Sequence, residues 1–237
     1  EENIMNVFEL KDRVAIVTGG GGTEHGTGRI IAMALADAGV SVVLAGRLDS
    51  HLASVAKELN AQGAQTLSVP CDVTDPAQCA DLVATTVAEL GRLDILVNNA
   101  GIVGETTTVR DLKNDILART FEVNVYGTWW MCKAAMPHLK KTEGCIVNVT
   151  SIAGLRPMGS SLAYGMAKAA LNALTEDLAK FHGPVRCNAV APGLVATPWT
   201  SEWGDLHTSI AAISPAGRSA TPEDCAMAVM ACVTNTY

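Results

Sequence analysis

The sequence has few aromatic residues and no long apolar run, and both features restrict the kind of protein that it encodes. Aromatic side chains make up 4% of the 237 residues. This is too few for an aromatic-rich β-sandwich, whereas abundant small apolar residues suit helices packed on Val/Ile-rich strands. No stretch of about 18 apolar residues is present to cross a bilayer, so we expect no membrane association. With 49% hydrophobic and 17% charged residues, the composition also excludes a disordered chain.

Positive charge and paired cysteines are also scarce. The chain has 17 basic and 24 acidic residues, for a net charge of −7, and no Lys/Arg cluster provides the basic patch that nucleic-acid binding needs. The seven cysteines are scattered without a Cys-x-x-Cys pair, which favours free thiols over disulfides or a metal site. Residues 1–5 do not resemble a secretory signal. We therefore expect a cytoplasmic protein without metal or nucleic acid.

Short apolar segments alternate with longer segments of helical periodicity. We expect strands at 13–18, 41–46, 65–70, 93–98, 145–150 and 185–191, and helices at 29–38, 49–62, 76–90, 112–139, 162–182 and 222–234. This alternation predicts a parallel sheet covered on both faces. The predicted fold class is α/β: one Rossmann-like, doubly wound domain over residues 1–237, with strand order 3-2-1-4-5-6 and three αβα layers. Residues 194–220 interrupt the pattern, and we expect them to form a substrate loop.

A glycine-rich turn follows the first predicted strand. Residues 18–28 include Gly19, Gly26, Thr27 and Gly28, and the first helix begins there. Glycines allow the backbone to approach a pyrophosphate at a helix N-terminus. A flexible loop would have a similar composition, but the place between a first strand and a first helix favours nucleotide binding.

The end of the second predicted strand bears on which nucleotide binds. An NAD site usually has an acidic residue there, whereas this chain has Ala45, Gly46 and Arg47. The Arg47 guanidinium is a suitable donor for a 2′-phosphate, and His25 would add a second donor. The alternative is that both are solvated loop residues. We favour NADP(H) as the cofactor, with NAD(H) as the alternative.

Tyr164 and Lys168 form a possible catalytic pair. A spacing of four places both side chains on one helix face. A free Tyr has a pKa of about 10, and we expect the nearby ammonium to lower it. Such a pair can exchange a proton with a carbonyl or an alcohol, although the same spacing arises by chance on exposed helices.

Two further polar residues belong to this predicted site. Ser151 follows the strand at 145–150, at the sheet edge where ligands of such folds bind, and its hydroxyl would bond the reacting oxygen. Asn124 lies inside the predicted helix 112–139, where Asn is unfavourable. It either bonds to local backbone or binds a water that connects to Lys168.

The ordered set of these motifs resembles the short-chain dehydrogenase/reductase family, in its shorter single-domain branch. The matching elements cover residues 10 to 233 and are, in chain order, the 18–28 turn, Cys71-Asp72-Val73, Asn98-Asn99-Ala100-Gly101, Asn124, Ser151, Tyr164, Lys168 and the segment 192–197. Any one of them would be a weak signal, but their joint order and spacing are specific.

The resemblance implies a role for each matching residue. Tyr164 would be the general acid/base, Lys168 its partner and ribose anchor, Ser151 the carbonyl polariser and Asn124 the relay. On the adenine side and along the central strands the implied cofactor contacts are Asp72, Val73, Asn98, Ala100 and Gly101. On the nicotinamide side they are Pro192, Gly193, Val195 and Thr197.

Two features depart from the family pattern. Six residues separate Gly19 from Gly26, where the family usually has three, so we expect a longer phosphate loop. Family members also continue into a further strand after the helix predicted at 222–234. We expect that strand to be absent from this sequence or to lie beyond it.

The resemblance implies an NADP(H)-dependent oxidoreductase that interconverts a carbonyl and a secondary alcohol. The segments expected around the substrate, 102–104, 155–161 and the loop with Trp199 and Trp203, are largely apolar, so we expect a small neutral or hydrophobic substrate. Trp199 and Trp203 would instead pack one lid helix if their spacing of four is helical. The alternatives are a 3-oxoacyl-(acyl carrier protein) reductase and a nucleotide-sensing regulatory relative. The resemblance also implies a homo-oligomer, a tetramer or dimer, that packs helices 112–139 and 162–182.

Overall fold

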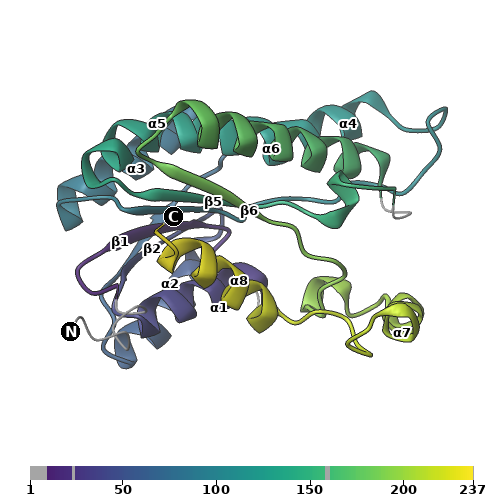
Figure 1. Ribbon diagram of the computed structural model, residues 1–237, viewed down its shortest axis with the longest axis horizontal. Coiled ribbons are helices and arrows are strands. Elements are labelled where there is room, and N and C mark those ends of the chain that lie inside the picture. Colours follow the sequence, from purple (N-terminus) through teal and green to yellow (C-terminus); the bar gives the residue numbers. More distant parts are fainter. Residues whose placement is uncertain (1–9, 23–24, 158–160, 237) are drawn as a thin grey trace.

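A six-stranded parallel sheet forms the centre of the protein (Figure 1). The structure is a computed structural model, and it describes residues 10–22, 25–157 and 161–236. The strand order β3-β2-β1-β4-β5-β6 confirms the prediction. The strands are β1 (Val14–Thr18), β2 (Ser41–Gly46), β3 (Thr66–Pro70), β4 (Ile95–Asn98), β5 (Cys145–Val149) and β6 (Arg186–Val190).

Helices cover both faces of the sheet, which confirms the three-layer αβα arrangement (Figure 1). One layer contains α1 (Thr27–Asp37), α2 (Asp49–Ala61) and α8 (Pro222–Thr234). The other contains α3 (Pro76–Leu90), α4 (Asn114–Phe121), α5 (Gly127–Thr142) and α6 (Leu162–Phe181). None of the helices within the described ranges is long and apolar enough to span a membrane.

The strands are apolar throughout because they are buried on both sides. All five residues of β1 are buried. Val14 and Ile16 belong to the core beneath α3 and α5, while Ala15 and Val17 belong to the core against α1, α2 and α8. Alternate side chains of a strand point to opposite faces of a sheet, so one short segment supports two cores.

The single helix expected at 112–139 is divided, which corrects the sequence prediction. Helices α4 and α5 are joined by a π-helical turn, Glu122–Tyr126. Within this turn the Asn124 amide donates to the carbonyl of Thr120, 2.9 Å away. A side chain that bonds to the carbonyl four residues earlier competes with the regular helical bond, and π-turns of this kind are often found at functional sites.

The segment 194–220 is more ordered than a loop, which is a second correction. It contains a 3₁₀ turn, Pro198–Thr200, and helix α7, Gly204–Ile213. Helix α7 buries none of its side chains, although Leu206, Ile210 and Ile213 recur at helical spacing. In Figure 1, α7 lies beyond the end of the sheet, away from the two helical layers.

Candidate active site

A cleft of about 580 Å³ opens where β5 and β6 end. Ligands of doubly wound folds bind outside the carboxyl ends of the strands, and the cleft occupies this position. Nine of the predicted site residues line it: Thr27, Gly101, Ser151, Tyr164, Lys168, Pro192, Gly193, Val195 and Thr197.

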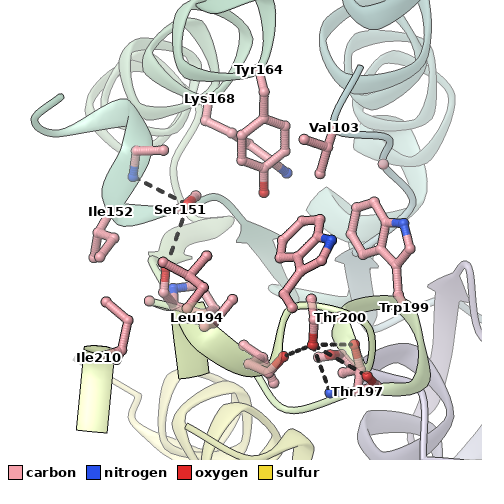
Figure 2. Close-up of a pocket in the computed structure, with 18 of the residues that line it drawn as sticks. Val103, Ser151, Ile152, Tyr164, Lys168, Leu194, Thr197, Trp199, Thr200 and Ile210 are labelled. Carbon is pink, nitrogen blue, oxygen red and sulfur yellow. Dashed lines mark hydrogen bonds between the residues drawn. The ribbon is translucent and has the colours of Figure 1, made fainter. Parts of the chain in front are cut away.

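Ser151 stands at the end of β5 with a fixed side chain. It is the N-cap of the 3₁₀ turn Ile152–Gly154, and its Oγ accepts a hydrogen bond from the backbone N–H of Ala153 (3.2 Å). The hydroxyl donates to the carbonyl of Pro192 over 3.5 Å. Figure 2 shows both bonds. The second one is long, and the hydroxyl is therefore available to a better acceptor.

Tyr164 and Lys168 lie one turn apart on α6, as the spacing predicts. The Tyr164 hydroxyl points into the cleft on the side of Ser151 (Figure 2). The Lys168 ammonium lies 5.5 Å from the centre of the Tyr164 ring and donates to the carbonyl of Val149 over 2.7 Å. The Lys168 side chain therefore faces the ring and the end of β5 rather than the phenolic oxygen.

The proton affinities of this pair differ from the sequence expectation. Burial raises the pKa of the Tyr164 phenol above its ordinary value of 10, and a hydrogen bond with Ser151 opposes part of this rise. Burial lowers the pKa of Lys168 from 10.5 to about 8. Desolvation penalises the charged form of each group. The expected lowering of the tyrosine pKa by the ammonium is absent, so Tyr164 is a neutral phenol at neutral pH.

Asn124 is fully buried and holds the chain that follows β4. Its Oδ1 accepts from the N–H of Ile102 (3.1 Å), and its Nδ2 donates to the carbonyl of Ile102 (2.8 Å) as well as to Thr120. A Cβ on Gly101 would lie 2.6 Å from Asn124 Oδ1 and 3.6 Å from Lys168 Nζ. The backbone-binding alternative for Asn124 is therefore present, and its amide adjoins Lys168 across Gly101.

A hydrogen-bonded clamp joins the glycine turn to the end of β4. Thr18 Oγ1 accepts from the N–H groups of Asn99 (3.0 Å) and Ala100 (3.1 Å), and Asn99 Nδ2 donates to the carbonyl of Thr18 (3.1 Å). A Cβ on Gly28 would overlap the carbonyl oxygen of Gly19 and lie 2.5 Å from Asn99 Nδ2. Only glycine at position 28 therefore allows α1 to begin so close to the strands.

The N-terminus of α1 fits a phosphate group. Gly26 is its N-cap, no side chain caps the helix, and its first turn contains no acidic residue. The backbone N–H groups at such an end are donors for an anion, reinforced by the helix dipole. Gly19 has a φ of 68°, which glycine adopts without strain. Thr23 and Glu24 of the long turn lie outside the described residues.

Arg47 and His25 are exposed at the same end of the sheet. Within the described ranges Arg47 forms no hydrogen bond or ion pair, and it attracts Asp72 through its charge. Arg29, the other nearby base, is paired with Glu58. Arg47 therefore remains available to an added phosphate.

Asp72 and Val73 lie just beyond β3. Asp72 Oδ1 accepts from the N–H (3.0 Å) and hydroxyl (2.8 Å) of Thr74. Burial raises the pKa of this carboxyl, but the Thr74 bonds and the charges of Arg119 and Arg47 outweigh it and hold the pKa below 3.8. Val73 is buried, and its side chain would meet a Cβ on Gly127 at 2.7 Å. Both residues thus have structural contacts of their own.

Asn98 does not bring its side chain into the cleft. It is 4% exposed, and its Nδ2 donates to Asn148 Oδ1 (2.9 Å) and to the Cys132 sulfur (3.3 Å). Asn148 in turn donates to Thr175 on α6 (2.9 Å). This buried network ties β4 and β5 to α6, which carries Tyr164.

Several lining residues have no counterpart among the predicted site residues. Part of the wall comes from the segment 200–213, whose additional lining residues are Thr200, Glu202, Asp205, Leu206 and Ile210. Asn99, Thr106 and Thr150 also line the cleft. The composition of 194–220 indicated a substrate loop, but nothing in it indicated which side chains face inward.

Trp199 and Trp203 both line the cleft, but they do not share a helix. Trp199 belongs to the 3₁₀ turn, and Trp203 is the N-cap of α7. The alternative in which they pack one lid helix is therefore wrong. Of the predicted substrate segment 155–161, residues 158–160 lie outside the described residues. In the described part of the chain, no cluster of His, Cys, Asp and Glu could hold a metal ion.

Comparison with known proteins places the chain in a family. Residues 20–235 match the family model described as enoyl-(acyl carrier protein) reductase. The chain is 40% identical over 236 residues to a putative ketoacyl reductase 2 of the granaticin polyketide synthase from Streptomyces violaceoruber, covering 94% of this chain and 90% of that protein. It is 32% identical to a 3β-hydroxysteroid dehydrogenase from Mediterraneibacter gnavus, covering 91% and 77%.

A solved structure has the same fold. The crystal structure of gox2181 superimposes with a TM-score of 0.91 at 29% identity, covering 97% of this chain and 92% of that one. The family generally uses NAD(P)(H), and the two relatives are named as a ketoacyl reductase and a hydroxysteroid dehydrogenase, which supports oxidation and reduction between carbonyl and alcohol. On these grounds the chain belongs to the short-chain dehydrogenase/reductase family of oxidoreductases.

Proposed function

We propose that the protein is an NADP(H)-dependent reductase of neutral, hydrophobic ketones or aldehydes. The observation that carries this proposal is the gathering of Ser151, Tyr164 and Lys168 on one wall of the cleft. The dinucleotide, when bound, supplies the hydride. The residues fit such a group because an uncapped helix N-terminus, the narrow Gly28 contact and exposed Arg47 lie at the same end of the sheet.

Each catalytic side chain has a role that follows from its environment. Tyr164, a phenol at neutral pH, donates its proton to the carbonyl oxygen during reduction. Ser151 donates a hydrogen bond to the same oxygen. Lys168 holds positive charge beside the ring and can donate to a ribose hydroxyl. Asn124 keeps the backbone at Gly101 close to Lys168, and a water there would complete the relay.

The lining of the cleft supports an uncharged substrate. The side chains beyond Ser151 are mostly apolar and include Val103, Ile152, Leu194, Leu206 and Ile210. Lys168 is the single basic side chain of this lining, whereas Glu202 and Asp205 are acidic. An anionic substrate would meet the like charge of Glu202 and Asp205, and its only counter-charge in the lining would be the buried Lys168 ammonium.

A second candidate is reduction of a 3-oxoacyl group attached to acyl carrier protein. The similarity to the granaticin ketoacyl reductase favours it. The acidic Glu202 and Asp205 of the lining count against it, because their charge would repel an acidic carrier.

The test is a panel of neutral ketones, aldehydes and a carrier-bound 3-oxoacyl thioester, each assayed with NADPH and NADH. We expect turnover of the hydrophobic ketones with NADPH. Selective turnover of the thioester would establish the second candidate. Tight cofactor binding without turnover of any carbonyl would indicate a regulatory protein and overturn the proposal.

Cofactor choice gives a sharper prediction. Replacement of Arg47 by alanine should raise the KM for NADPH about 10- to 100-fold, because a charge-assisted hydrogen bond contributes about 1.5–3 kcal/mol. The KM for NADH should change little. Arg110→Ala is the matched control, because Arg110 is 88% exposed and lies in a different loop. Equal effects of Arg47→Ala on both cofactors would contradict an NADP-specific role.

We also propose self-association through α5, α6 and the preceding π-turn. Exposed apolar side chains of these elements are Tyr126, Trp129, Leu162, Met166 and Phe181. Exposed apolar surface beyond isolated residues marks interaction sites. Light scattering should give a dimer or tetramer, and Trp129→Glu should lower the mass. A monomeric wild-type protein would contradict the proposal.

A further inference from the structure

Helix α7 forms one wall of the cleft but has almost nothing to hold it there. Asp205, Leu206 and Ile210 face the cleft, and no side chain of the helix is buried. A helix of 10 residues is too short to be stable in water without packing. Its position must therefore depend on a few specific contacts.

His207 supplies those contacts. Its Nδ1 lies 2.8 Å from Ser219 Oγ, and its Nε2 lies 3.1 Å from the carbonyl oxygen of Thr200. Thr208 and Ser209 bond only to carbonyls of α7 itself. Among the residues that the structure describes, His207 makes the only side-chain hydrogen bonds from α7 to another segment.

Both bonds are satisfied by one neutral form of the imidazole. With the proton on Nε2, the ring donates to the Thr200 carbonyl and accepts at Nδ1 from the Ser219 hydroxyl. Thr200 and Ser219 are buried, with 6% and 9% of their surface exposed. Leaving such groups without partners is costly, so the ring is held in one orientation.

Thr200 connects this ring to the predicted nicotinamide side of the cleft. Its Oγ1 donates to the carbonyl of Val195 (2.6 Å) and accepts from the N–H of Thr197 (3.2 Å). Figure 2 shows the hydrogen bond between the Thr200 hydroxyl and the backbone N–H of Thr197. The same Oγ1 lies 3.2 Å from His207 Nε2.

Ser219 connects the His207 ring to the segment 194–197 through its neighbour in the chain. Its neighbour Ala220 donates to the carbonyl of Leu194 (3.0 Å) and accepts from the N–H of Ala196 (2.8 Å). The two anchors of His207 are thus parts of one hydrogen-bonded unit that lines the cleft. Movement of the imidazole would move α7 relative to this unit.

We propose that His207 is a positioning residue that sets the substrate wall formed by α7 and thereby controls the size of carbonyl compound accepted. The hydrogen-bonded group of His207, Thr200 and Ser219 is termed the His207 cluster. His207 itself does not line the cleft. The inference rests on the proposed function for the substrate, but the placement of α7 by the cluster is independent of any reaction.

The experiment compares His207→Leu with the control Ser209→Ala, whose hydroxyl bonds only within α7. Hydrogen exchange should be faster across residues 204–213 in His207→Leu and unchanged in the control. With a bulky neutral ketone, KM should rise about 10-fold, as expected for two lost hydrogen bonds. The kcat and the affinity for NADPH should stay within about threefold, and His207→Gln should recover part of the loss because its amide both donates and accepts.

Ser219→Ala is the milder variant should His207→Leu fail to fold. It removes one bond and should give the same changes at about two- to fivefold. Wild-type exchange of α7 in a folded His207→Leu protein would overturn the proposal, whatever its activity. Faster exchange in an enzyme that turns over no carbonyl would instead refute the proposed function and leave the His207 cluster intact. Equal changes for small and bulky ketones would contradict the control of substrate size.

Discussion

Replacing Tyr164 with phenylalanine should lower kcat for ketone reduction by roughly 10²- to 10⁴-fold, the usual contribution of a general acid. The phenol points into the cleft beside Ser151 (Figure 2), and burial raises its pKa above 10. It is therefore protonated at the pH at which it must donate. Among the described lining residues the carboxylic acids are Glu202 and Asp205, which belong to the segment 194–220 and not to α6.

For Tyr164→Phe, cofactor binding and turnover are measured separately. The dissociation constant for NADPH, followed by fluorescence, should change less than about threefold, because phenylalanine keeps the ring that packs beside Lys168. Tyr126→Phe, at a half-exposed position of the π-turn, is the matched control and should retain full turnover. A Tyr164→Phe enzyme with wild-type kcat would exclude Tyr164 as the proton donor.

Replacing Lys168 with methionine should abolish most activity and yet stabilise the protein. Lys168 is 4% exposed, and its burial lowers the pKa from 10.5 to about 8. At pH 7 the folded state therefore carries an ammonium at a site that disfavours charge. Methionine has a similar shape without the charge, so we expect the free energy of unfolding to rise by about 2 kcal/mol, after the lost bond to Val149 is subtracted.

The stability gained by Lys168→Met should decline as the pH rises above about 8. Below pH 8 both folded and unfolded states of the wild type bind the proton, so the full cost of the buried ammonium is present. Between pH 8 and 10.5 the folded state has lost the proton that the unfolded state keeps, so the cost declines as pH rises. The gain from Lys168→Met should therefore be largest near pH 7 and should become a slight loss above pH 10.5, where only the missing bond to Val149 remains.

Urea unfolding at pH 7 and pH 10 measures this difference. Lys57→Met, at an exposed position of α2, is the control and should change stability little at either pH. Turnover of Lys168→Met with NADPH should fall by about 10²-fold or more, since both the proposed ribose contact and the charge are lost. A destabilised Lys168→Met protein at pH 7 would mean that the bond to Val149 outweighs the cost of burial. Such opposition between stability and activity is common at active sites.

The sheet could be predicted from sequence because its signals are local. Each strand is a short apolar run between polar segments, and the structure reproduces all six within two residues of the predicted bounds. The glycine turn and the spacing of Ser151, Tyr164 and Lys168 are also local patterns, and they are sufficient to indicate the family. These features depend on which residues follow one another, and the right-handed crossover rule supplies the remaining order.

Other properties depend on segments distant in the chain, and there the sequence was insufficient. At the divided helix, Asn124 combines a local bond to Thr120 with bonds to Ile102 on another segment, and the inward side chain of Asn98 follows from its bond to Asn148. The raised pKa of Tyr164 arises from burial, which no spacing reveals. Helix α7 takes its place through His207 rather than through an apolar face. Backbone periodicity and glycine chemistry are encoded within a few residues, whereas burial and hydrogen-bond partners exist only once the chain has packed.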